Sequence, residues 1–169
     1  MVSFQKNKSK VSNLVFFGKT IKENKSIKIL GLTIGKTSGL LDHCKEKAAL
    51  ANQRVNLLKM VRGKNWGANR RTLLRLYKQL VRPVLEYGAA AFGKKDKLAI
   101  KQLELAERRA LRVVTSSHSK SSIQDLYELT GIEPLGERIQ SLRLKALARF
   151  DHKSKGLQDL EVLKEIIGV

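Results

Sequence analysis

The chain has 169 residues, of which 42% are hydrophobic, so it is long enough and apolar enough to fold around a buried core. Its 34 lysines and arginines exceed its 15 acidic residues by a net charge of +19, which points to an anionic partner, most often nucleic acid; a basic surface that only aids solubility is the alternative. The single cysteine excludes a disulfide within the chain, and the sequence has no membrane-length apolar run and no secretory signal, so we expect an intracellular protein, nuclear or cytoplasmic, with no membrane partner.

Residues 1–36 are rich in lysine, with eight lysines and one acidic residue. Two short runs within them, at residues 13–17 and 27–34, are rich in Val, Ile and Phe, which predicts two strands separated by a polar loop. Gly31 and Gly35 indicate a tight turn or a close approach of the backbone. We therefore expect residues 1–37 to form a small β element.

From about residue 38 the apolar residues recur at alternating three- and four-residue steps. This spacing predicts an amphipathic helix of about 24 residues that stops before Gly63, because glycine commonly follows a helix C-terminus. Its apolar positions are Leu41, Cys44, Ala48, Ala51, Val55 and Leu58, and Arg62 continues the spacing. Cys44 is therefore expected to be a small core residue.

A second helix is predicted at about residues 69–91, after a glycine-containing turn, with Asn69 as its N-cap. Pro83 lies inside it and has no backbone N–H, so we expect a kink near residues 79–81. A buried stripe is predicted at Leu73, Leu76, Tyr77, Leu80, Val84 and Tyr87.

The stretch from Arg62 to Arg82 contains seven basic residues and no acidic one. Because the apolar stripe faces the core, we expect these cations to point away from it and to contact the phosphates of a polyanion. The candidate nucleic-acid-binding residues are Arg62, Lys64, Arg70, Arg71, Arg75, Lys78 and Arg82.

Residues 64–92 resemble the region that follows the polymerase palm in reverse transcriptases of non-LTR retrotransposons. In that family a tryptophan–glycine turn opens a helix of the form L-x-x-L-Y-x-x-L-x-x-P-x-L-x-Y-G. The matching residues are Trp66, Gly67, Leu73, Leu76, Tyr77, Leu80, Pro83, Leu85, Tyr87 and Gly88. Phe92 stands where the family usually has a tryptophan, and the resemblance extends over roughly residues 3–150.

The resemblance implies that residues 38–115 form a thumb-like helical bundle. Such a bundle would bind primer–template nucleic acid, an RNA–DNA hybrid or a duplex, independently of sequence. The same family resemblance implies that Leu30 and Gly31 correspond to the primer grip, a hairpin that holds the 3′ end of the growing strand. Ile29 stands where the family often has an aromatic residue, and an ordinary β-hairpin is the alternative interpretation.

A third helix is predicted at about residues 96–115, with an apolar face made of Ile100, Leu103, Ala106, Ala110 and Val113. Glu104 and Glu107 share one face of it near basic residues, so we expect surface ion pairs and not an acid–base pair.

Residues 116–169 are predicted to be a helical connection and C-terminal extension. Ser122 and Asp125 resemble a capping box, and Pro134 favours the start of a helix. The pattern predicts an exposed serine-rich loop (116–122), a short helix (122–131), a longer helix (134–150), a polar linker (151–156) and a last helix (157–167).

The sequence contains no two adjacent acidic residues, whereas reverse transcriptases hold their catalytic metal ions with an aspartate pair. We expect that pair, with the fingers and most of the palm, to lie N-terminal to residue 1, and a ribonuclease H domain to lie downstream. His43, His118 and His152 are far apart in the sequence, and no Gly-rich phosphate loop occurs, so we assign no catalytic residue, metal site or cofactor.

The expected protein is a mainly α-helical fragment without activity of its own. The alternatives are a free-standing basic helical nucleic-acid-binding protein and a helical protein–protein adaptor.

Overall fold

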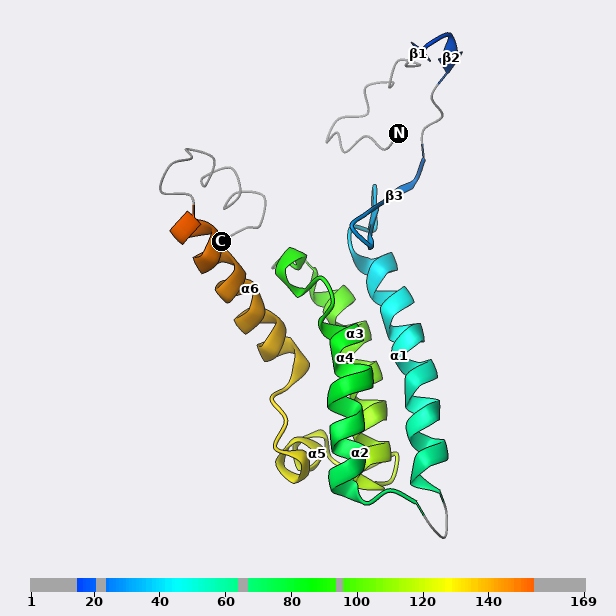
Figure 1. Cartoon of the computed structure of the whole chain (residues 1–169), viewed down its shortest axis with the longest axis vertical. Coiled ribbons are helices and arrows are strands. Elements are labelled where there is room, and N and C mark those ends of the chain that lie inside the picture. Colours follow the sequence, from blue (N-terminus) through cyan, green and yellow to red (C-terminus); the bar gives the residue numbers. More distant parts are fainter. Residues whose placement is uncertain (1–14, 21–23, 64–66, 94–95, 154–169) are drawn as a thin grey trace.

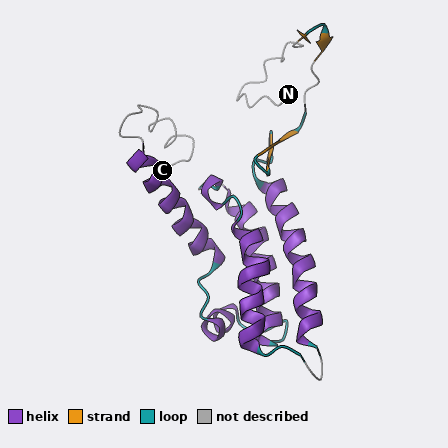
Figure 2. Cartoon of the chain, in the orientation of Figure 1, coloured by secondary structure: helices purple, strands orange, loops and turns teal. Residues whose placement is uncertain are grey.

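The structure, a computed structural model, describes residues 15–20, 24–63, 67–93 and 96–153 (Figure 1). It is a mainly helical bundle preceded by small two-stranded antiparallel sheets, which confirms the predicted fold class (Figure 2). The strands are β1 (Val15–Phe16), β2 (Lys19–Thr20), β3 (Ser26–Ile29) and β4 (Leu32–Gly35). The helices are α1 (Leu41–Arg62), α2 (Arg70–Leu76), η1 (Tyr77–Val81), α3 (Arg82–Glu86), η2 (Ala89–Ala91), α4 (Lys97–Thr115), α5 (Ile123–Thr130) and α6 (Leu135–Lys153). None of the described helices has the length and apolar character needed to cross a membrane.

Residues 27–34 form a β-hairpin, as both interpretations of the Leu30-Gly31 pair predicted, and not one continuous strand. β3 pairs with β4, with Ile29 opposite Leu32. The turn residues Leu30 and Gly31 both have positive φ angles, 48° and 78°, as a two-residue turn of the type I′ class requires. The expectation of a tight turn at Gly31 is therefore confirmed, and that turn divides the apolar run in two.

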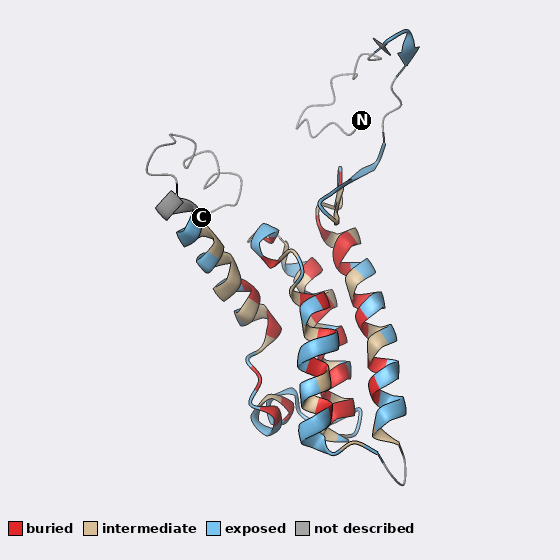
Figure 3. Ribbon diagram, in the orientation of Figure 1, coloured by how far each residue is buried: buried red, intermediate tan, exposed pale blue. Residues whose placement is uncertain are grey.

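Helix α1 agrees with the prediction at its C-terminal end, at Gly63, and begins three residues later than expected, at Leu41. It packs against α4 more extensively than any other pair of helices does. The two helices run in the same direction, and α2–α3 runs back between their ends (Figure 1). Their buried residues line the sides that face one another (Figure 3), and Cys44 is fully buried among them, as predicted.

The second predicted helix is interrupted where the proline argument places a kink. Five residues, Tyr77–Val81, form a π-helical turn, and α3 ends at Glu86, five residues before the predicted end. Asn69 caps α2, since its side chain accepts a hydrogen bond from the backbone N–H of Thr72 at 2.9 Å.

The π turn changes which residues are buried. Leu73, Tyr77 and Val84 lie in the core as predicted. Leu80 and Tyr87 are exposed, which corrects the predicted stripe, and Val81 and Leu85 are buried in their place. The π turn holds an extra residue, which accounts for Val81 replacing Leu80 in the core. Tyr87 lies beyond the last residue of α3, in extended backbone, so the helical spacing does not apply to it.

Helices α4, α5 and α6 confirm the three helices predicted between residues 96 and 150. Leu126 and Leu135 belong to the same buried cluster as the residues of α1 and α4. Two details are wrong: the Ser122 side chain makes no capping hydrogen bond, and α6 continues to Lys153 through the start of the predicted linker. The last predicted helix, at residues 157–167, lies outside the described residues. The division of the chain at residues 37 and 115 stays a prediction.

Candidate nucleic-acid interface

Three of the candidate cations lie on one exposed face of the second helical segment. Arg71 and Arg75 are on α2, and Lys78 is on η1. All three are exposed, and within the described part of the chain none of them forms an ion pair. Their spacing of four and three residues places them on one side of the helix, opposite the buried Leu73 and Tyr77.

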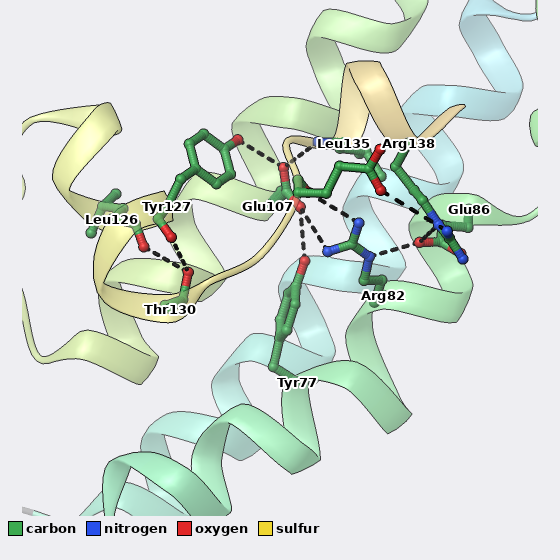
Figure 4. Close-up of polar contacts among 10 residues, drawn as sticks. Tyr77, Arg82, Glu86, Glu107, Leu126, Tyr127, Thr130, Leu135 and Arg138 are labelled. Atoms are coloured by element: carbon green, nitrogen blue, oxygen red, sulfur yellow. Dashed lines mark hydrogen bonds and ion pairs between the residues drawn. The ribbon is translucent and has the colours of Figure 1, made fainter. Parts of the chain in front are cut away.

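Arg82 does not point away from the core, which corrects the expectation for that residue. Its Nε donates to Glu86 Oε1 at 2.7 Å, and its Nη2 donates to the backbone C=O of Glu133 at 3.1 Å. Its Nη1 lies 4.0 Å from Glu107 Oε1, and its side chain is only 13% exposed. The guanidinium is therefore held within the fold, between α3, α4 and the residues before α6 (Figure 4).

The other candidate cations are placed differently again. Arg70 is exposed, but its Nη2 donates to the backbone C=O of Leu129 at 3.0 Å, which links the first turn of α2 to α5. Arg62 lies in the last turn of α1 and lines a groove beside α4. Lys64 and Trp66 lie outside the described residues. The structure thus groups Arg71, Arg75 and Lys78 and separates them from the remaining candidates.

Glu107 is the polar centre of the bundle and not a surface residue, so the predicted surface ion pair is wrong for it. It is fully buried and accepts hydrogen bonds from the hydroxyls of Tyr77 and Tyr127, both at 2.9 Å (Figure 4). The backbone N–H of Leu135, at the start of α6, donates to it at 3.1 Å. Glu104, one turn earlier, does form the expected surface pair, with Arg108 at 3.3 Å.

Burial controls the ionisation of this group of residues. Desolvation raises the pKa of Glu107 above its ordinary value, while its hydrogen bonds and Arg82 act in the opposite direction. Desolvation, and then the neighbouring Glu107, raises the pKa of Tyr77 and of Tyr127, so both hydroxyls keep their protons and act as donors. These contacts join α4 to η1, α5 and α6, and their role is to hold the bundle together.

A second polar contact ties α3 to α6. Glu86 Oε1 accepts from Arg82 Nε and, at 3.3 Å, from Arg138 Nε. Sequence reasoning missed both this contact and the role of Glu107. The available signal was position: Glu107 follows Ala106 and precedes Ala110 by three residues, so it lies at the edge of the apolar face of α4.

The β3–β4 hairpin contacts the segment that follows α3. The Tyr87 hydroxyl donates to the backbone C=O of Leu30 at 2.7 Å, and Leu30 itself is 89% exposed. Lys47 Nζ lies 4.4 Å from the centroid of the Tyr87 ring. The hairpin turn and the Tyr-Gly pair, 57 residues apart in sequence, therefore lie side by side.

Glycine is favoured on both sides of this contact, because Gly31 and Gly88 both have positive φ angles and close neighbours. A Cβ added at Gly31 would lie 2.8 Å from the Tyr87 hydroxyl. A Cβ added at Gly88 would lie 2.4 Å from Leu32 Cδ2 on β4, and Gly88 also has a positive φ of 81°. The buried His43 on α1 lies next to this contact, with its Nε2 3.5 Å from the carbonyl oxygen of Tyr87. Burial lowers the pKa of His43.

No protein-family model, curated protein or solved structure matches this chain. Among the described residues, His, Cys, Asp and Glu side chains do not gather in a group that could hold a metal ion. The second helical segment presents three exposed cations, Arg71, Arg75 and Lys78, that form no ion pair with any residue the structure describes.

Proposed function

We propose that this chain is a non-catalytic nucleic-acid-binding module similar to the thumb and connection regions of non-LTR retrotransposon reverse transcriptases. It binds primer–template duplex through phosphate contacts. The observation that carries the proposal is the exposed, acid-free face formed by Arg71, Arg75 and Lys78. Arg70 lies at its edge, and Arg82 is not part of it because its guanidinium is held by Glu86 and the backbone of Glu133.

The dimensions of this face suit a nucleic-acid backbone. Residues 71 and 78 are seven positions apart, which is roughly 10 Å along a helix axis. Duplex DNA carries one negative charge for about every 1.7 Å of its axis, so a face of this length meets several phosphates. Phosphate contacts fix the position of a protein on a duplex without reading its sequence, so binding is expected to be sequence-independent.

The contact between the hairpin and Tyr87 supports treating the N-terminal element and the bundle as one unit. Both partners in it, Leu30-Gly31 and Tyr87-Gly88, belong to the segments that carry the family resemblance. The family's palm and fingers, and a downstream ribonuclease H domain, are the further partners that this proposal implies.

The test is an anisotropy titration of the full chain with labelled duplexes. Two DNA duplexes of unrelated sequence and one RNA–DNA hybrid are compared at low salt, and affinity is then followed as salt is raised. The proposal predicts similar affinity for both sequences and a steep loss of affinity with salt. Absence of binding at low salt would refute it and favour the protein–protein adaptor, and a strong preference for one sequence would contradict the phosphate-only mode.

A further inference from the structure

A basic groove lies between the C-terminal halves of α1 and α4, apart from the α2 face. Its cavity volume is about 570 Å³. Each helix contributes two cations to its lining, Lys59 and Arg62 from α1 and Arg109 and Arg112 from α4. Among the described residues that line it there is no acidic side chain. The rest of the lining is polar but neutral, from Asn52, Asn56, Ser117 and Ser119, or apolar, from Val55 and Val113.

The fold itself brings these charges together. Helices α1 and α4 pack side by side and run in the same direction, so their C-terminal turns lie at the same end of the bundle (Figure 1). The serine-rich loop that follows α4 closes this end and adds its hydroxyls to the groove. The sequence predicts this segment as an exposed serine-rich loop and gives no sign that it lies beside a groove.

The cations of the groove lack anionic partners and hydrogen-bond acceptors among the described residues. Within the part of the chain that the structure describes, none of its four cations forms an ion pair. The Nε of Arg112 is buried and has no hydrogen-bond partner among the described residues. Cations in a last helical turn are favoured by the helix dipole, which accounts for Lys59, Arg62 and Arg112. The dipole does not account for Arg109, one turn earlier, nor does it supply an acceptor for the buried Nε.

We propose that this groove is a phosphate-binding site. Arginine guanidinium groups match the oxygens of phosphate in paired hydrogen bonds, lysine adds a point charge, and serine and asparagine donate to the remaining oxygens. Because the cations converge from two walls, the groove suits linked phosphates, as in a nucleic-acid strand or a small polyphosphate. The site stands on its own geometry and does not depend on the α2 face.

The experiment uses two charge-matched double variants of the full chain. Lys59→Glu with Arg109→Glu reverses one exposed cation on each wall of the groove. Lys45→Glu with Lys101→Glu reverses one exposed lysine on each of the same two helices outside the groove. Both change the net charge equally, and circular dichroism verifies that each remains folded. Lys59→Gln with Arg109→Gln repeats the test without placing acids in the groove.

Two probes separate the sources of phosphate: tripolyphosphate, measured by calorimetry, and a labelled single-stranded oligonucleotide, measured by anisotropy. The groove variant should lose about tenfold or more in affinity for at least one probe, relative to the control variant. Loss for tripolyphosphate alone identifies a small polyphosphate ligand, and loss for the oligonucleotide identifies a nucleic-acid strand. Equal affinities of the groove and control variants for both probes would overturn the site. The α2 proposal fails separately, if Arg71→Glu with Arg75→Glu leaves duplex binding unchanged.

Discussion

Replacing Glu107 with leucine should destabilise the bundle severely, although the sequence predicts a surface position. The substitution removes the acceptor of three hydrogen bonds, and two of the donors, the Tyr77 hydroxyl and the Leu135 N–H, belong to fully buried residues. A buried donor left unpaired costs about 1–3 kcal/mol, so the two together cost about 2–6 kcal/mol. That is a large share of the roughly 5–15 kcal/mol that stabilises an ordinary domain.

Urea denaturation followed by far-UV circular dichroism measures this loss. Glu104→Leu is the matched control, since Glu104 lies on the same helix, is partly exposed, and among the described residues forms an ion pair with Arg108 alone. Adding Tyr77→Phe to Glu107→Leu removes one of the two unpaired donors. The double variant should therefore lose less unfolding free energy than the two single variants lose together. If Glu107→Leu changes the unfolding free energy by no more than about 0.5 kcal/mol, as exposed substitutions do, the buried role of Glu107 is refuted.

The pH dependence of the same variant gives an independent check. The folded-state pKa of Glu107 is raised by burial, so the native state binds its proton more tightly than the unfolded chain does. Its contribution to stability is therefore fully present below the ordinary pKa of a glutamate and is lost as the pH rises through the raised value. The stability advantage of the wild type over Glu107→Leu should shrink as the pH rises from about 4 toward neutrality. An advantage that grows over this range would contradict the direction of the shift.

Three further predictions concern the contact between the hairpin and Tyr87 and the absence of polymerase activity. Gly88→Ala should lower the free energy of unfolding more than Gly131→Ala in denaturant titrations. Both glycines have positive φ angles, but an added Cβ meets a side chain, that of Leu32, only at Gly88. Equal losses of stability would contradict the close approach of Leu32 to Gly88. Tyr87→Phe should raise amide hydrogen exchange in β3–β4 and cost about 0.5–1.5 kcal/mol, since it removes the hydrogen bond to Leu30; unchanged exchange would show that this bond does not hold the hairpin. Purified full chain should not extend a primer with Mg²⁺ or Mn²⁺, because it has no adjacent carboxylate pair; template-dependent extension lost on mutating an acidic residue would refute this.

Most of the helical architecture was predictable because it depends on local spacing. The apolar steps of α1 and α4, the Asn69 cap and the interruption before Pro83 all follow from rules that act within a few residues. The pattern of apolar residues alone predicts one strand at residues 27–34, and the hairpin at Leu30 was predicted from Gly31 and from the family resemblance, because an apolar run does not show where a chain reverses.

The roles of individual charged residues could not be predicted in the same way. Arg82 has Glu86 four residues later, a spacing that favours a local ion pair, whereas Arg71 has no acid at such a spacing. Only tertiary packing brings the Glu133 carbonyl and Glu107 to the Arg82 guanidinium and buries it, and Arg71 stays exposed. Glu107 is buried because Tyr127 and Leu135, 20 and 28 residues away, cover it. The groove between α1 and α4 likewise depends on contacts between distant segments.

The salt dependence of duplex binding by Arg71→Glu with Arg75→Glu tests the central claim most directly. Both side chains are exposed and unpaired among the described residues, so the substitutions should leave the fold intact. If both contact phosphates, the slope of log affinity against log salt should fall in magnitude by about 1.4–1.8, alike for unrelated duplex sequences. Lys45→Glu with Lys101→Glu, which changes the net charge equally, should leave the slope near that of the wild type. Equal slopes and affinities for the two double variants would contradict the account, because the face formed by Arg71, Arg75 and Lys78 would then not be the nucleic-acid surface.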